Sequence, residues 1–314
     1  MNSNSASYYV FPIAMVCFLF SAKVLSYEYA CGFSEKNLSF AGTPLQQANC
    51  LLKQITIGGD LAKTSPSLPP HLKSLIGNKV SIDKSKIIKY FSDNNISDTA
   101  VGGSITESLS HSSEGSKPVA RYFVIHDVSY NVCDKKEKLH NTDSPSAEWN
   151  LSKTWENSTQ AHLYITRDGK FLSPQGRTFA TPWRATQLEL DKVGKPSMGL
   201  FLHVENIQVR TAAYPPGGIY WVKKKNKNGR VYIDCENDRI AQTPGFTDIQ
   251  LSRLALAYII ASYRKGSWLI PAYHANIDRG ISGGHDDPQN FDLDKWSNNI
   301  CSILTELNSP DCKM

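Results

Sequence analysis

Short apolar runs separated by polar turns recur through the second two thirds of the chain. Residues 121–126 and 161–166 are nearly continuous in apolar side chains, which is typical of buried strands. Asp168 and Gly169 follow the second run as a tight-turn signal, so we expect a hairpin that ends near residue 172. Further candidates are a strand at 198–209, a hairpin at 219–234 and a strand or loop at 268–274.

A long buried helix is expected to follow these strands. Thr247 and Gln250 have the spacing of a capping box, in which each side chain bonds to the backbone N–H of the other residue. Residues 251–263 are apolar nearly all round, and Gly266 is a natural stop. Strands that alternate with helices predict an α/β domain over residues 117–306, with a mixed central β-sheet flanked by helices.

The chain begins with a segment typical of exported proteins. Residues 8–22 are almost wholly apolar, and small or apolar residues lead up to Ser26, so we expect a signal peptide at residues 1–26. A membrane anchor is the alternative, since no Lys or Arg precedes the apolar run, but the run is short for a span of about 20 residues. We therefore expect a periplasmic or secreted protein with no stable membrane span after signal cleavage.

Residues 27–116 differ in pattern from the α/β domain. They contain helix-like stretches at 45–55 and 84–91, and they end in a segment rich in Ser and Gly. This pattern favours a mainly helical N-terminal region followed by a linker or surface loop. Residues 307–314 are expected to form a C-terminal tail.

Composition and cysteine content agree with an exported globular protein. Of the 314 residues, 40% are hydrophobic and 20% charged, and the net charge of +5 is well below that of a nucleic-acid binder, so we expect no nucleic-acid partner. Six cysteines follow the expected signal peptide, and an even number in an exported chain suggests disulfides. Proximity along the chain favours the pairs Cys31–Cys50 and Cys301–Cys312, which leaves Cys133 for Cys235.

Two histidines and one carboxylate have the arrangement of a catalytic metal site. His126 and His274 end strand-like runs, which places them at the edge of the predicted sheet, where sites are usually built. A Gly-Gly loop downstream of His274 leads to Asp287, whose carboxylate can fold back toward that histidine. Two imidazoles and one carboxylate form a typical catalytic zinc set, which leaves one position open for water.

The segments around these residues resemble the type 2 N-acetylmuramoyl-L-alanine amidases, relatives of phage amidase lysozymes and peptidoglycan-recognition proteins. The similar segments, in family order, are residues 124–129, 161–169, 197–200, 246–250, 274–280 and 287–292. The resemblance implies a Zn²⁺ ion held by His126, His274 and Asp287. It also implies cleavage of the amide between N-acetylmuramic acid and the L-alanine of the stem peptide, in peptidoglycan or in muropeptides. Bound zinc lowers the pKa of water to about 7 and polarises a carbonyl.

The general base is the first departure from the family pattern. Family members commonly carry a Glu directly after the 197–200 motif or a Tyr just before the second-strand histidine, and this chain has Phe201 and Ala161 there. Glu205 is the expected substitute, because alternate residues of a strand share one face. It would take a proton from the zinc-bound water and pass it to the leaving nitrogen. The alternative is that Glu205 pairs with a cation such as Arg210.

His285 is the second departure, since the family often has a Lys two residues before the carboxylate ligand. We expect His285 to donate to the oxyanion. The alternative is that His285 is itself a ligand and displaces Asp287, although the Asp-Pro pair matches the family's ligand position.

Several other residues are candidates for supporting positions. His162 and His203 are expected behind the ligands or in the pocket wall, or else as structural histidines. Asp127 and Asp286 adjoin proposed site residues and are candidates to orient the ligands. Aromatic candidates for a sugar groove, with the core as the alternative, are Trp183, Tyr214, Tyr220 and Trp221.

These patterns together predict an exported zinc amidase. The alternative is a non-catalytic peptidoglycan-recognition protein that binds wall fragments without cutting them, and competent residues at all three ligand positions favour the enzyme. The sequence contains no HExxH motif of a zinc peptidase and no GxSxG motif of a serine hydrolase. The sequence leaves the oligomeric state open.

Overall fold

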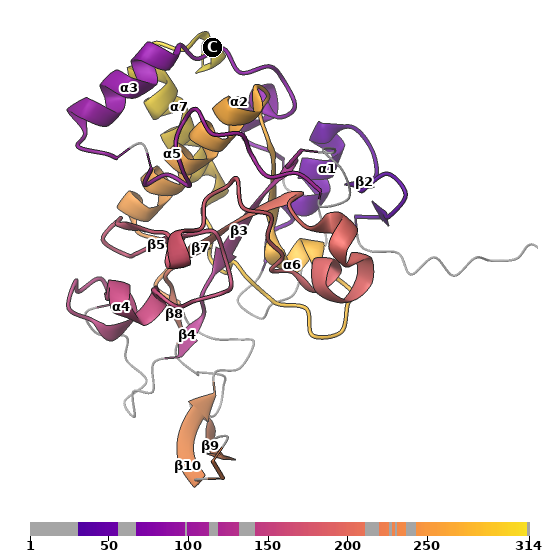
Figure 1. Ribbon diagram of the computed structural model, residues 1–314, viewed down its shortest axis with the longest axis vertical. Helices are drawn as coiled ribbons and strands as arrows, with labels where there is room; N and C mark the ends of the chain where they lie inside the picture. Colours follow the sequence, from indigo (N-terminus) through magenta and orange to yellow (C-terminus); the bar gives the residue numbers. More distant parts are fainter. Residues whose placement is uncertain are drawn as a thin grey trace, which may run out of the picture.

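The computed structural model describes the chain over residues 31–55, 67–97, 99–112, 119–131, 142–210, 220–225, 228–229, 231–236 and 243–312 (Figure 1). The expected signal peptide and Tyr214 lie outside the described residues. Cys133 also lies outside them, and with it the expected bond to Cys235. None of the helices in the described part of the chain is long and apolar enough to cross a membrane.

The centre of the molecule is a mixed five-stranded sheet with the strand order β11-β3-β7-β5-β6. Its strands are β3 (Tyr122–Asp127), β5 (Leu163–Ile165), β6 (Phe171–Leu172), β7 (Phe201–Asn206) and β11 (Ile270–Tyr273). Neighbours are parallel except for β5 and β6, which form an antiparallel hairpin. The predicted α/β class with a mixed sheet is confirmed, as are the buried strand at 121–126 and the hairpin that follows residue 161.

One face of the sheet is covered by α5 (Asp248–Lys265) and α7 (Leu293–Glu306) (Figure 1). The capping box of Thr247 and Gln250 starts α5, and Gly266 ends it in the left-handed conformation at φ 79°. Tyr258 of α5 packs edge-on against Phe123 of β3, with ring centroids 5.3 Å apart. The predicted buried helix is therefore confirmed, since most of its residues are buried and it packs against α7.

The opposite face of the sheet is covered in part by the N-terminal region. The elements on this face are α1 (Pro44–Leu51) and the paired strands β1 (Phe33–Ser34) and β2 (Ser39–Phe40), whereas α2 (Pro70–Leu75) contacts α7 and is followed in the chain by α3 (Lys84–Asp93). The hydroxyl of Tyr122 donates to Oε1 of Gln47 in α1 and accepts from the backbone N–H of Phe40, each at 2.9 Å. The N-terminal region thus packs directly on the strand that carries His126.

The two regions expected from the sequence share one hydrophobic core. A single cluster of buried apolar side chains contains Leu51 and Ile87 together with Phe123 and Leu254. The segment 102–116, expected to be a linker or surface loop, instead buries Ile105 and Leu109 in its described part. The many Ser and Gly residues around these apolar side chains led to the prediction of a linker.

The remaining elements are short and lie mostly in the connections between the strands of the sheet and the long helices. They are α4 (Ser152–Trp155), α6 (His274–Ile277), β4 (Tyr130–Asn131), β8 (Val209–Arg210), β9 (Tyr220–Lys225), β10 (Val231–Glu236), the single turns Glu148–Asn150, Pro174–Gly176, Lys195–Ser197 and Pro310–Cys312, and the π-helical segment η3 (Leu188–Val193). Strands β9 and β10 form the antiparallel hairpin predicted around Asn228-Gly229. The expected disulfides Cys31–Cys50 and Cys301–Cys312 are both present.

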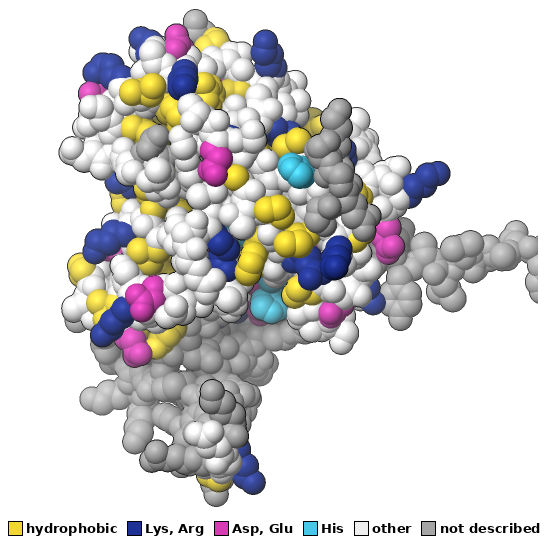
Figure 2. Space-filling model, in the orientation of Figure 1, with side chains coloured by type: hydrophobic (Ala, Val, Ile, Leu, Met, Phe, Trp, Pro, Cys, Tyr) yellow, Lys and Arg dark blue, Asp and Glu magenta, His cyan; other side chains and the backbone are white. Residues whose placement is uncertain are grey.

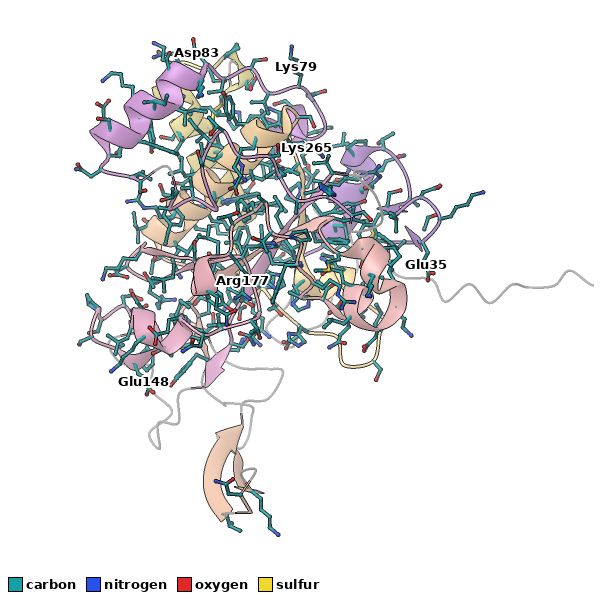
Figure 3. The ribbon with its side chains drawn as sticks, viewed as in Figure 1. Glu35, Lys79, Asp83, Glu148, Arg177 and Lys265 are labelled. Atoms are coloured by element: carbon teal, nitrogen blue, oxygen red, sulfur yellow. A yellow bond between two sulfur atoms is a disulfide. The ribbon has the colours of Figure 1, made fainter. Side chains whose placement is uncertain are left out.

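Charged side chains of both signs are interspersed over the face shown in Figure 2. The described residues of that face do not form one large basic patch. Lys265, at the end of α5, is half-buried (Figure 3). Burial lowers the pKa of Lys265 to about 8, and the nearby positive charge of Arg121 adds to this effect.

Candidate metal centre

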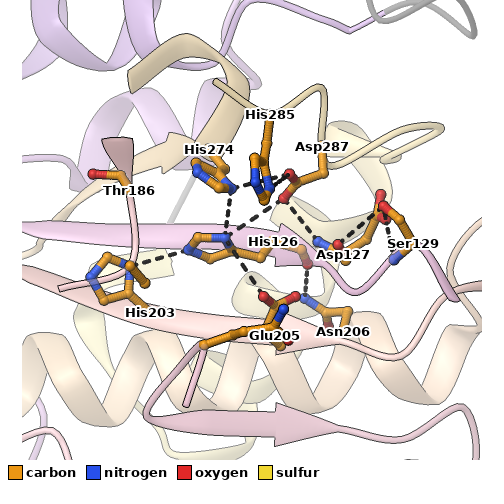
Figure 4. Close-up of polar contacts among 12 residues, drawn as sticks. His126, Asp127, Ser129, Thr186, His203, Glu205, Asn206, His274, His285 and Asp287 are labelled. Atoms are coloured by element: carbon orange, nitrogen blue, oxygen red, sulfur yellow. Dashed lines mark hydrogen bonds and ion pairs between the residues drawn. The ribbon is translucent and has the colours of Figure 1, made fainter. Parts of the chain in front are cut away.

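The centre forms where two parallel neighbouring strands end. His126 is the fifth residue of β3, and His274 directly follows β11 as the first residue of α6. Tyr273 pairs with Ile125, so the next residues along, His274 and His126, lie side by side. Asp287, on the loop after α6, completes the group, and all three side chains are buried (Figure 4).

The three side chains present nitrogen and oxygen atoms at metal-ligand spacing. Nδ1 of His126 lies 2.9 Å from Nδ1 of His274 and 3.6 Å from Oδ2 of Asp287. Nδ1 of His274 lies 3.1 Å from Oδ1 of Asp287. Tetrahedral zinc with bonds of about 2.0–2.1 Å keeps its ligand atoms about 3.3 Å apart. The spacing therefore fits a small divalent cation held by His126, His274 and Asp287.

Hydrogen bonding leaves the Nδ1 atom of His274 free to face its neighbours. Nε2 of His274 lies 2.8 Å from Oδ2 of Asp278, whose two carboxylate oxygens accept the backbone N–H groups of Gln187 and Leu188 at 3.0 Å each. Nε2 therefore carries a proton toward Asp278. Although burial opposes the charged ring, the carboxylates of Asp287 and Asp278 raise the pKa of His274 well above its ordinary value. The two carboxylates thus stabilise a positive charge at this position, which either a proton or a metal ion supplies.

His126 is held neutral in the same pocket. Burial, followed by the positive charge of neighbouring His274, lowers the pKa of His126 well below its ordinary value. Its Nε2 lies 3.1 Å from Nδ1 of His203, at the side of the ring that faces away from Asp287. A neutral imidazole with one nitrogen engaged in this way offers the other nitrogen as a ligand.

The loop that carries Asp287 is fixed by a buried ion-pair network. The guanidinium of Arg210 lies 2.9 Å from the carboxylate of Asp127 and 3.1 Å from that of Asp286. Asp127 in turn accepts the backbone N–H of Gln289 at 2.8 Å, and its own N–H donates to Oδ2 of Asp287 at 3.2 Å. Asp127 and Asp286 therefore orient the ligand loop without entering the group of three ligands.

Glu205 lies beside this group on the neighbouring strand. It pairs with His126 in the register of β3 and β7, and its Oε1 is 3.9 Å from Nδ1 of His126. Its Oε2 is buried without a hydrogen-bond partner among the described residues. Burial, and then the charge of Asp287, raises the pKa of Glu205 well above its ordinary value. The described ion pairs of Arg210 are made to Asp127 and Asp286 rather than to Glu205.

His285 lies at the solvent side of the centre. Its side chain is 56% exposed, its Nδ1 is 3.6 Å from Oδ1 of Asp287, and its ring centroid is 4.6 Å from that of His274. The group of three convergent ligand atoms contains Asp287 and not His285. An exposed imidazole in this position can reach a bound substrate over the ligands.

The structure also brings in residues that the sequence analysis missed. Tyr164 pairs with Glu205 across β5 and β7, and burial, together with the charge of Glu205, raises its pKa above the ordinary range. Strand alternation from His162 to Tyr164 is the signal that points to this residue. Asp278 lies four residues after His274, a spacing that places both on one face of a helical turn.

The other predicted supporting residues fall in different places. His203 lies directly behind His126, whereas His162 bonds to the backbone of Thr181 and of His203. The ring of Trp183 lies under the guanidinium of Arg177 at 4.3 Å. The side chains of Tyr220 and Trp221 lie outside the described part of the chain.

A second group with ligand-type atoms consists of His71, Cys301 and Cys312. The two sulfurs are joined in a disulfide, so neither is available as a thiolate ligand. The buried group of His126, His274 and Asp287 is therefore the candidate metal centre of the described residues. Comparison of the sequence with models of known protein families and with curated proteins finds no match in either.

Proposed function

We propose that this protein is an exported, zinc-dependent N-acetylmuramoyl-L-alanine amidase that acts on peptidoglycan or on muropeptides. One observation carries the proposal. The Nδ1 atoms of His126 and His274 converge with the carboxylate of Asp287, and the buried carboxyl group of Glu205 lies 3.9 Å from the first of them. This arrangement supports hydrolysis of an amide, and the similarity of the ordered segments around it to type 2 amidases identifies which amide bond is cut.

Zinc, when bound, supplies a Lewis acid for the amide carbonyl and lowers the pKa of an attacking water. The protein's part is to hold the substrate amide above His274 and to move the protons. Glu205, whose Oε1 lies 3.9 Å from Nδ1 of His126, accepts a proton from the attacking water. It then returns that proton to the leaving nitrogen, so that water and amide become a carboxylic acid and an amine. His285 donates an N–H to the carbonyl oxygen from the solvent side.

The second candidate is a protein that binds wall fragments without cutting them. It is favoured by Phe201 and Ala161, which stand where the family commonly has a Glu and a Tyr. Burial of Glu205 beside the ligands argues against it, because its Oε2 is buried without a hydrogen-bond partner among the described residues, and a catalytic role would account for that cost in stability.

The products of digestion distinguish the two candidates. Purified protein from residue 27 onward is incubated with peptidoglycan and with soluble muropeptides, and the products are identified by mass. The proposal expects free stem peptides that begin with L-alanine. Retention on the wall with no released peptide would support the recognition protein instead.

A further inference from the structure

Behind the metal centre, three buried side chains form a continuous line of polar contacts that leads away from the cation. Nε2 of His126 lies 3.1 Å from Nδ1 of His203 (Figure 4), and Nε2 of His203 lies 3.1 Å from Oε2 of Glu189. His203 and Glu189 are both fully buried. Neither residue belongs to the group of ligands.

Glu189 is fixed at the far end of this line. Its Oε2 accepts the backbone N–H groups of Ala185 and Thr186 at 3.2 and 3.1 Å and the hydroxyl of Thr186 at 2.9 Å. The carboxyl group therefore keeps its place at the start of η3 whether or not His203 is present. It offers the ring of His203 an acceptor at a set position.

The line fixes which nitrogen of each ring carries the proton. Nε2 of His203 makes no well-aligned hydrogen bond to a described residue, and Oε2 of Glu189 lies 3.1 Å from it, at hydrogen-bonding distance. A proton on that nitrogen is favoured by the carboxylate, so Nδ1 of His203 is left as an acceptor. Nε2 of His126 then donates to it, and Nδ1 of His126 keeps its lone pair directed at the ligand position.

We propose that His203 and Glu189 are positioning residues of the metal centre, which hold His126 in the tautomer and orientation that bind the cation. Hydrogen-bonded partners of metal-bound imidazoles commonly raise metal affinity by 10-fold to 100-fold. The proposal rests on the metal centre of the proposed function, but it concerns cation binding and not the reaction that follows.

His162 provides a matched control on the neighbouring strand. Its ring stacks on that of His203, with centroids 5.5 Å apart and planes 6° from parallel, and it is equally buried. Its hydrogen bonds go to the backbone of Thr181 and of His203, at 3.0 Å each. A residue that only fills the core between these strands would behave like His162.

The experiment measures zinc affinity by competition with a chromophoric chelator for the wild type and four variants. His203→Phe keeps a ring but loses the acceptor, and we expect its affinity to fall by about 10-fold to 100-fold. His203→Asn places an amide oxygen where Nδ1 stood, and we expect it to stay within a few-fold of the wild type. The zinc affinity of Glu189→Gln should lie between the affinities of these two variants. His162→Phe should change stability but leave affinity unchanged.

A second readout reports the tautomer without any metal or substrate. Nitrogen-15 spectra of the histidine rings should show His126 protonated at Nε2 in the wild type and in His203→Asn. In His203→Phe a fraction of His126 should move its proton to Nδ1. A purely structural role for His203 would not produce this difference, since the control His162→Phe disturbs the same packing.

Each result decides one question. Equal zinc affinity in His203→Phe and wild type, or an equal loss in His162→Phe, overturns the positioning role. Zinc binding that follows the expected order, without any cleavage of peptidoglycan by the wild type, supports the positioning role and refutes only the proposed amidase. Absence of zinc binding by the wild type overturns both.

Discussion

Nδ1 of His126 and Nδ1 of His274 face each other at 2.9 Å, and each ring directs its other nitrogen to a separate partner. Two lone pairs and the carboxylate of Asp287 in such proximity repel one another unless a cation lies between them. The raised pKa of His274 has the same cause in the metal-free protein, where a proton takes the place of the cation. The predictions for the metal centre below depend on this pair of Nδ1 atoms.

Asp278 should be required for tight metal binding. Its carboxylate holds Nε2 of His274 at 2.8 Å and is itself fixed by two backbone N–H groups. Replacement Asp278→Asn should lower zinc affinity by about 10-fold to 100-fold, because the ring loses its charged acceptor. Competition with a chelator measures the change. The exposed Asp191, in the adjacent η3, supplies the control Asp191→Asn, which should bind zinc like the wild type.

Glu205 should be required for catalysis and not for metal binding. The variant Glu205→Gln keeps the size of the side chain but cannot take up a proton, so kcat should fall by about 100-fold to 10,000-fold. Zinc content should stay at the wild-type value. Exposed Glu156 provides the control Glu156→Gln. Full activity of Glu205→Gln would assign the general base to another residue.

His285 should act on the substrate from the solvent side. We expect His285→Ala to lower kcat by about 100-fold to 1,000-fold, the range found when one oxyanion donor is removed. Its zinc content should not change, because Asp287 already completes the three ligands. Loss of zinc from His285→Ala would instead identify His285 as a ligand.

Lys265 should make the stability of the protein depend on pH at alkaline values. Its folded-state pKa of about 8 lies below the ordinary 10.5, so between these values the unfolded chain binds the extra proton and stability rises with pH. As pH falls through the folded pKa this gain is lost. Denaturant titrations of wild type and Lys265→Met from pH 7 to 10 should converge toward the alkaline end. Exposed Lys192 supplies the control Lys192→Met, and a constant difference between wild type and Lys265→Met would contradict the pKa shift.

The elements that hold the ligands could be predicted because their signals are local. The apolar run that ends at His126 and the capping box at Thr247 each lie within a few residues, and both β3 and α5 form where the pattern places them. The mixed sheet follows from the alternation of such segments. Local patterns are sufficient here because strands and caps depend on neighbouring residues.

His203 and Asp127 could be named as supporting candidates from the sequence, but their own partners could not, because these come from distant segments. Glu189 faces His203 from the short segment η3, for which the sequence carries no helix signal, and Asp127 meets Arg210 across 83 positions. The amide of Asn276 binds the carbonyls of Leu51 and Lys53, at 2.9 and 2.8 Å, and so ties α6 to the N-terminal region. Such contacts depend on how the sheet brings its strands together, and the spacing of residues along the chain does not reveal that arrangement.

The most direct test of the account is the release of stem peptide from peptidoglycan as zinc is added back to protein freed of metal by a chelator. We predict no release without metal, a rise that levels off at one zinc per chain, and no release at any zinc level for His274→Ala. Peptide release that persists without metal, or in His274→Ala, would contradict the metal centre. Zinc binding at one per chain with no release would contradict the amidase.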